Sequence, residues 1–332
     1  MIFWQIVVDN LPFLLYNVVT PHRKGENKKK LKHTLHIMST ITSRDNSTLI
    51  DNKYTNQNGE VFSNLNEVKS EMPYYISFLK NKRVYIPNTK KTVSIASRDA
   101  FVEYFESSSI LNKFGIKELS YSYYDENSNF ILITFDGKKI SRMEIDASDD
   151  DSRLFHVMKQ IDKVDVVIGN PEGCKVNDLV RYIYLSKKDF IFSVNKLFTS
   201  YKIAYSLLEN NDIFFGYNLP KKFFNVKKNK MENRGDMMWI SSFDNGYRPK
   251  FVDTLYTTKY HVYDKYENCD AINVDCIKMI PMDYKGVMGV PATIACQLNW
   301  EQFELVGELC TKAGIVNGEK VHARLLIRFR NN

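Results

Sequence analysis

The side chains best suited to chemistry in this chain stand at the end of one apolar run. Residues 164–173 read Val-Asp-Val-Val-Ile-Gly-Asn-Pro-Glu-Gly. The amide oxygen of Asn170 and the carbonyl oxygen of Pro171 can each accept a hydrogen bond from an amino group on a planar base, which leaves the amino nitrogen more electron-rich for attack on a methyl sulfonium. A flat side chain after Pro171 could hold that base by stacking, but Glu172 and Gly173 supply no ring. The simpler alternative is a turn, because Asn-Pro is a common turn dipeptide.

An alternation of strands and helices must position these residues. The β-branched run 164–168 is typical of a strand buried in a parallel sheet, and Asp136-Gly137 between two apolar runs predicts a hairpin of 130–135 and 139–145. The other predicted strands are 83–87, 118–124, 190–194, 213–217 and 237–241, and the predicted helices are 68–80, 99–113, 153–160, 179–185 and 201–208. This order predicts an α/β fold with a mainly parallel sheet, in which ligands bind beyond the carboxyl ends of the strands.

The charge of the chain is compatible with a polyanionic partner. The 332 residues carry a formal net charge of +7, with 44% apolar and 26% charged residues, as in an ordinary folded protein. Positive charge is concentrated in one short segment, where Asn and Phe separate the basic residues Lys221, Lys222, Lys227, Lys228, Lys230 and Arg234. We interpret this segment as an exposed basic loop, which either contacts nucleic-acid phosphates or is only solvated.

Cysteine spacing argues against metal and disulfide chemistry. The five cysteines are odd in number and none are paired as Cys-x-x-Cys, so we expect reduced thiols in a cytoplasmic protein and no metal. Residues 1–48 are predicted to be a flexible N-terminal extension with a basic run, and 49–332 to form the folded domain. The apolar start is interrupted by Asp9, Asn10 and Pro12, so it predicts neither a membrane span nor a convincing signal peptide.

A long run near the C-terminus carries a family resemblance. Residues 264–306 read DKYENCDAINVDCIKMIPMDYKGVMGVPATIACQLNWEQFELV. The residues of this run, and the order in which they occur, resemble the C-terminal part of the EcoRI-type adenine-specific DNA methyltransferases. Looser matches extend the resemblance over roughly residues 51–310, and they include Glu71, Tyr75, Asn195, Gly216 and Trp239.

The resemblance implies a fold, a cofactor and a set of site residues. It implies a Rossmann-like methyltransferase fold, S-adenosylmethionine as methyl donor and double-stranded DNA as substrate. By position, Asn170 and Pro171 would accept the adenine amino group, with Glu172 and Gly173 in the last two places of that motif. The cofactor-binding residues that it implies are Asp51, Tyr54, Thr55, Asp151 and Asp165.

The chain departs from the family pattern where methyl transfer needs chemistry. The family's Asn-Pro-Pro-Phe is Asn-Pro-Glu-Gly here, and its acidic segment after the 83–87 strand is Pro87-Asn88-Thr89-Lys90-Lys91-Thr92. Lysines cannot accept hydrogen bonds from ribose hydroxyls and would repel a cationic sulfonium. We therefore expect weak or absent cofactor binding. Three functions stay open: an adenine-specific DNA methyltransferase, an inactive relative that binds DNA or a partner, and a methyltransferase acting on RNA or protein.

Overall fold

The computed structural model describes most of the chain after residue 60. The described residues are 61–87, 99–124, 129–145, 150–171, 175–225, 228, 230–310 and 312–330. All of them belong to one compact unit, Asn46–Asn332. The boundary at residue 48 lies outside the described residues and stays a prediction.

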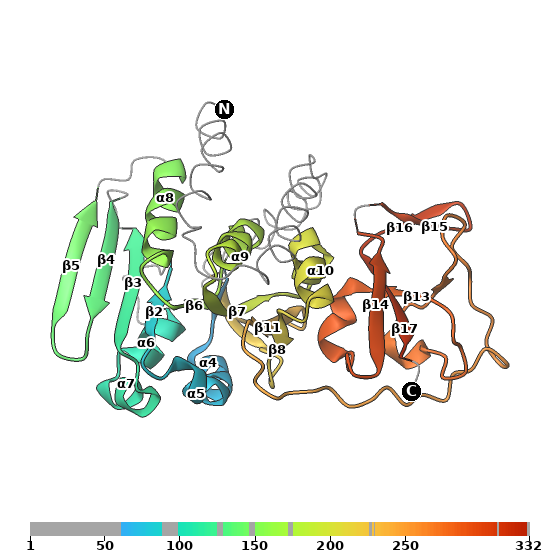
Figure 1. Cartoon of the computed structure of the whole chain (residues 1–332), viewed down its shortest axis with the longest axis horizontal. Helices are drawn as coiled ribbons and strands as arrows, with labels where there is room; N and C mark the ends of the chain where they lie inside the picture. The colour runs from blue at the N-terminus through green and yellow to red at the C-terminus, as the bar shows by residue number, and fades with distance from the viewer. Residues whose placement is uncertain are drawn as a thin grey trace, which may run out of the picture. The chain divides into compact units, whose positions relative to one another are not determined.

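An eight-stranded sheet organises the first two thirds of the described chain (Figure 1). Its order is β5-β4-β3-β2-β6-β7-β11-β8, where the central strands β3, β2, β6 and β7 are parallel and the outer strands join antiparallel. The strands are β2 (Arg83–Ile86), β3 (Glu118–Tyr124), β4 (Phe130–Phe135), β5 (Ile140–Ile145), β6 (Val166–Gly169), β7 (Asp189–Asn195), β8 (Phe214–Phe215) and β11 (Met237–Ser241). The predicted α/β class is confirmed, and parallel pairing is confined to the middle of the sheet.

Helices cover both faces of this sheet (Figure 1). Side chains alternate along each strand, so Tyr85 and Val167 pack into one core while Val84 and Ile168 pack into the other. The first core contains α8 (Asp150–Ile161), α9 (Lys175–Leu185) and α10 (Lys202–Glu209), and the second contains α4 (Leu65–Glu71), η1 (Met72–Tyr75), α5 (Ile76–Leu79), α6 (Ala100–Phe105) and α7 (Ser108–Phe114). Strands buried on both faces explain the continuous apolar runs in the sequence.

Two predicted helices are interrupted. The helix predicted at 68–80 changes to a 3-10 turn at η1, which has Pro73 in its first turn. The helix predicted at 99–113 is two helices, because α6 ends after Phe105 and Ser107 is the N-cap of α7. Periodicity over the whole window could not reveal this break, since both helices bury apolar residues in the same core.

A smaller sheet follows the large one and shares its first core. Its order is β12-β13-β17-β14, and a separate hairpin pairs β15 with β16. Thr199, in the turn η3 (Lys196–Ser200) after β7, links the two sheets by donating a 2.7 Å hydrogen bond to the carbonyl of Ala292. The elements are β12 (Ile272–Asn273), η4 (Ile277–Met279), β13 (Met288–Pro291), η5 (Ala292–Gln297), β14 (Phe303–Glu308), β15 (Gly314–Val316), β16 (Glu319–Val321) and β17 (Arg324–Phe329).

The basic segment is a hairpin and not the loop that its composition predicted. β9 (Lys222–Asn225) pairs antiparallel with both β10 (Lys230–Asn233) and β1 (Val61–Ser63). Phe223 and Phe224 are buried, with 0% and 7% of their surface exposed. The partner strand β1 lies about 160 residues earlier in the chain, so local sequence carries no signal for the pairing.

Asp99 should make folding stability depend on pH. Its buried carboxylate caps α6 by accepting hydrogen bonds from the backbone of Phe101 (2.9 Å) and Val102 (3.2 Å), but burial raises its pKa from 3.8 to about 6. Because the folded-state pKa is the higher one, this contribution to stability is complete below about pH 4 and is lost as the pH rises through 6. Asp99→Asn keeps a capping oxygen without the charge. We expect it to remove this pH dependence and to gain about 2–3 kcal/mol over the wild type at about pH 8.

Urea unfolding of both proteins at about pH 5 and pH 8 measures the difference. An Asp99→Asn variant that keeps the pH slope of the wild type would assign that slope to other groups.

Candidate active site

Asn170 and Pro171 lie where the strand order of the large sheet reverses. β2 and β6 are adjacent and parallel, but the chain continues from β2 to β3 on one side and from β6 to β7 on the other. Such a switch point opens a crevice at the carboxyl ends of the strands. Both residues follow β6 at this edge and are half-buried. A Cβ built on Gly169 would lie 3.8 Å from Cδ of Pro87, so the ends of β6 and β2 adjoin.

A hydrogen-bonded network occupies the same edge at the next two strands. Asn195 ends β7 and donates to Asp236, just before β11, at 2.7 Å. The Arg234 guanidinium donates to both carboxylate oxygens of Asp236, at 2.9 and 2.6 Å. Burial raises the pKa of Asp236, but the hydrogen bonds and charge of Arg234 outweigh it and hold the pKa below its ordinary value. Lys196 adds two bonds, from its backbone to Asp236 and from its ammonium to the Gly235 carbonyl.

This network joins the basic hairpin to the edge that carries Asn170. The hairpin's ends are closed by a 2.7 Å hydrogen bond from the Arg234 backbone to the Lys221 carbonyl. Its first strand is also bonded to α4, where Glu67 accepts from the backbone of Lys222 at 3.0 Å. The hairpin is thus held between the start of α4 and the carboxyl edge of the sheet.

Asp165 is at the opposite end of β6 from Asn170. It accepts hydrogen bonds from the Arg83 backbone (2.9 Å) and from its guanidinium (3.2 and 2.9 Å). The Arg83 side chain lowers the pKa of Asp165 to about 2. Four residues of strand, and so five residue steps, separate it from Asn170, which is about 16 Å. Asp165 therefore joins the starts of β2 and β6, away from the strand ends that carry Asn170.

Several predicted site residues lie outside the described residues. These are Asp51, Tyr54, Thr55, Glu172, Gly173 and Lys227. Asp151 is in the first turn of α8. Their assignments stay predictions.

The predicted nucleic-acid residues differ in how their charges are used. Lys221, Lys222 and Lys230 are exposed. Lys228 is exposed as well but forms a 2.9 Å ion pair with Glu232, and the Arg234 charge is engaged by Asp236. The first three lysines are therefore the stronger candidates for phosphate contacts.

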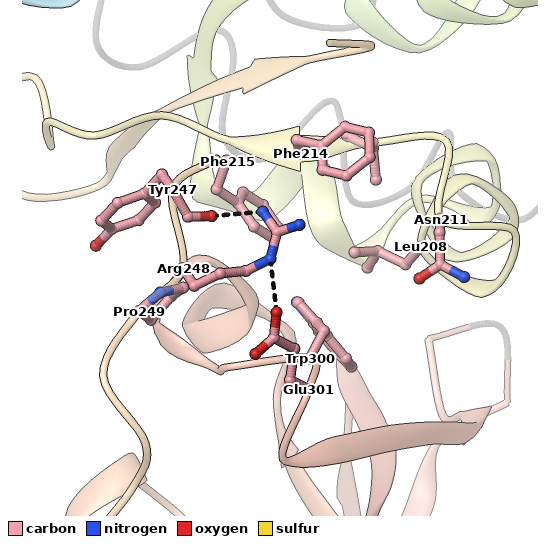
Figure 2. Close-up of a pocket in the computed structure, with 10 residues that line it drawn as sticks. Leu208, Asn211, Phe214, Phe215, Tyr247, Arg248, Pro249, Trp300 and Glu301 are labelled. Atoms are coloured by element: carbon pink, nitrogen blue, oxygen red, sulfur yellow. Dashed lines mark hydrogen bonds and ion pairs between the residues drawn. The ribbon is translucent and has the colours of Figure 1, made fainter. Parts of the chain in front are cut away.

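A small pocket at the far edge of the large sheet does not fit an anionic or cofactor ligand. Its volume is about 140 Å³, and its walls include Phe214, Phe215 and Trp300 (Figure 2). Phe214 pairs with Ser241 at the edge where β6 and β7 begin. The Arg248 guanidinium in this pocket donates to Glu301 at 3.3 Å (Figure 2). It also donates to Asp244 at 2.9 Å, so its charge is already compensated.

Sequence reasoning did not assign Asn195 or Asp236 to the site. Asn195 had a local signal, because it ends an apolar strand just as Asn170 does. Asp236 had none, since its neighbours at this end of the sheet are distant in sequence. Among the described residues, no cluster of His, Cys, Asp and Glu could hold a metal ion. The helices described are also too short or too polar to cross a membrane.

Comparison with known proteins agrees with this architecture. A family model described as adenine-specific methyltransferase EcoRI matches residues 136–330, more than half of the chain. The chain is 28% identical over 310 residues to the type II methyltransferase M.EcoRI of Escherichia coli, which covers 81% of this chain and 92% of the relative. It is 25% identical over 291 residues to the type II methyltransferase M.MgeORF184P of Mycoplasma genitalium (80% and 88%) and 24% identical over 289 residues to M.MpnI of Mycoplasma pneumoniae (80% and 88%). The chain belongs to the EcoRI family of adenine-specific methyltransferases.

Proposed function

We propose that this protein transfers a methyl group from S-adenosylmethionine to the amino group of adenine in double-stranded DNA. The observation that carries the proposal is the place of Asn170 and Pro171, half-buried beyond β6 at the switch point of the sheet. Membership of the family and the type II methyltransferase relatives support it.

Two oxygens at this site suit the chemistry. The Asn170 side-chain oxygen and the Pro171 carbonyl would each accept one hydrogen of the adenine amino group, directing the nitrogen lone pair away from the ring. S-adenosylmethionine, when bound, supplies a methyl group on a positively charged sulfur. Placement and electrostatics then dominate catalysis, so the site needs no nucleophile or general base on the protein.

The proposed cofactor site is assigned from the family pattern. Asp51, Tyr54, Thr55 and Asp151 are the residues we propose for it, by their positions in the family pattern. Among the described carboxylates, Asp236 at the candidate edge is engaged by Arg234 and Asn195. We propose a weakened cofactor site, because Lys90 and Lys91 follow the strand β2 where the family has acids.

The basic hairpin is the proposed contact to DNA phosphates. We expect Lys221→Gln, Lys222→Gln and Lys230→Gln together to weaken duplex binding and to lower the slope of log K against log salt by about one per lost contact. The matched control replaces Lys138, Lys139 and Lys163 by Gln. These lysines are equally exposed but lie at the other end of the strands, where the parallel strands begin. The affinity of each protein for duplex DNA is measured at several salt concentrations. Equal losses of affinity in the two triple variants would show that the hairpin is not part of the DNA interface.

Cofactor binding and methyl incorporation test the proposed function directly. Purified protein is titrated with labelled S-adenosylmethionine and then incubated with double-stranded DNA, and label in the DNA is counted. The proposal requires label in adenine. DNA that stays unlabelled at saturating cofactor would reject it.

A second candidate function is DNA binding without methyl transfer. Glu172 and Gly173 favour it, because they leave the motif without a stacking ring, and so do Lys90 and Lys91. Salt-dependent binding of duplex DNA with no incorporation is its expected result. The double change Glu172→Pro and Gly173→Phe separates the two defects, since activity gained from the pair would locate the loss in the base clamp alone.

A cytoplasmic location is part of the proposal. The cysteines that the structure describes, Cys269, Cys276, Cys296 and Cys310, are free thiols, as expected in a reducing compartment that contains the DNA.

A further inference from the structure

The strand β5 is an open edge of the large sheet. It is the outermost strand at the left of Figure 1 and, within the described residues, pairs with β4 alone. Five of its six residues are exposed, including Ile140 (69%) and Met143 (43%). An exposed edge of this length, with apolar side chains and unpaired backbone groups, is a template for another strand.

Alternation along β5 determines which backbone groups face outward. At the hairpin turn, the Asp136 backbone donates to the Lys139 carbonyl, so this pair is hydrogen-bonded. Hydrogen-bonded pairs recur at every second position of an antiparallel ladder. Residues 141, 143 and 145 therefore direct their backbone groups toward β4, and residues 140, 142 and 144 direct theirs outward.

The sequence of β5 is self-complementary in one antiparallel register. With a two-fold axis at Met143, Arg142 of each copy stands opposite Glu144 of the other, and both residues have outward-facing backbone groups. Axes at Arg142 or Glu144 would set like charges opposite each other, which is unfavourable. An axis between two residues would oppose an outward-facing residue to an inward-facing one, so the ladder could not form.

The side chains at this axis also fit. Met143 is opposite Leu132 of β4 and so lies on the same face of the sheet, where Leu132 is only 6% exposed. Two Met143 side chains at the axis would cover each other and extend this apolar face. On the other face, Arg142 and Glu144 already form a 3.1 Å ion pair within the chain, with about half of each side chain exposed, and Glu144 also accepts from Asn129 at 3.2 Å. Both can therefore reach a second copy.

We propose that two copies of this chain associate through antiparallel pairing of their β5 strands, about a two-fold axis at Met143. The two large sheets then form one continuous sheet across the dimer. This interface is separate from the proposed active site and does not depend on methyl transfer, so its test stands apart from that of the function.

Disulfide trapping tests the register. In it, the two Cα atoms of residue 143 are about 4.5 Å apart, which a disulfide can span. Met143→Cys should form a covalent dimer under mild oxidation. Ile140→Cys is the matched control, because it is more exposed, but the two copies of residue 140 would be about 20 Å apart. Wild type oxidised alongside reports any crosslinking by the native cysteines.

A charge exchange tests the association without oxidation. Sedimentation of the wild type over a range of concentrations should show a monomer–dimer equilibrium. Arg142→Glu or Glu144→Arg alone should weaken dimerisation at least about tenfold, and the double variant should restore it, because the opposed charges return with reversed sign.

Two results would overturn the proposal. One is a wild-type protein that sediments as a monomer at every concentration. That result would also be expected if β5 pairs with a different protein instead of a second copy. The other is Met143→Cys crosslinking no better than Ile140→Cys. Thermal unfolding of each variant shows whether it is folded, and loss of the exposed intrachain pair should hardly change stability.

Discussion

Replacing Asn170 with Ala should lower methyl transfer to DNA at least about 100-fold while S-adenosylmethionine binding is retained. The reason lies in the two acceptors beyond β6, of which only the Asn170 oxygen belongs to a side chain. Without it, one amino hydrogen of the base loses its partner and the nitrogen lone pair is no longer directed toward the methyl group. The effect should fall on the rate at saturating substrate, because the acceptor acts most strongly as charge develops on the nitrogen.

Single-turnover methylation with labelled cofactor measures this effect, and thermal unfolding separates it from misfolding. Asn170→Asp serves as the conservative variant, because it keeps an acceptor oxygen, and its rate should fall between those of the wild type and Asn170→Ala. Asn195→Ala is a second comparison at the end of the next strand. It should lower stability, because Asn195 bonds to Asp236 and to the Leu197 backbone. Wild-type rates in Asn170→Ala would mean that the base is held elsewhere.

Gly216→Ala should destabilise the fold by about 2–5 kcal/mol. A Cβ at this position would meet Oε1 of Glu71 and Cβ of Trp239, both at 2.4 Å, and these two residues are buried. Overpacking of this kind typically costs about 1–3 kcal/mol. The second contribution comes from Glu71, whose carboxylate must move away from its donors. One of them, the Tyr75 hydroxyl, is buried, and an unpaired buried donor costs about 1–3 kcal/mol more.

The environment of Glu71 explains why its movement is costly. Its oxygens accept from the backbones of Tyr217 (3.1 Å) and Asn218 (2.9 Å), and from the Tyr75 hydroxyl (3.2 Å). Burial raises the pKa of Glu71, and these hydrogen bonds oppose the shift. The carboxylate thus joins α4 to the chain leaving β8.

Gly235→Ala is the matched control, because a Cβ there would have nothing within 4 Å. Its stability should stay within about 0.5 kcal/mol of the wild type. Urea unfolding of the two variants and the wild type gives the comparison. Equal stabilities for both glycine variants would show that the contacts around Gly216 relax freely.

Four residues that match the family pattern meet in one cluster around Gly216. Glu71, Tyr75, Gly216 and Trp239 matched the family pattern as scattered single residues. In the folded chain they meet, with Glu71 between the Tyr75 hydroxyl and the space that a Gly216 side chain would fill. A glycine is needed here because of a close approach between elements about 150 residues apart.

Local sequence determined the elements of this protein and the chemical character of its site. Apolar runs buried on both faces of a sheet leave a signal within a few residues, and so the strands β2, β3, β6 and β7 were predicted close to their observed bounds. Asn170 and Pro171 could be placed at a strand end for the same reason. The chemistry of their oxygens depends only on residue type.

Tertiary structure alone decided which residues share an edge. Asp165 is five positions from Asn170 in sequence, yet the extended strand between them puts it at the other end of the sheet. Asp236 is 66 positions away and lies at the same edge, because β11 begins where β7 ends. The basic hairpin also pairs with β1, about 160 residues earlier in the chain, and Gly216 is required by Glu71 and Trp239. These outcomes depend on pairings between segments that are distant in sequence. The free energy of such a pairing comes from packing in the folded chain, so a local pattern of residues cannot predict it.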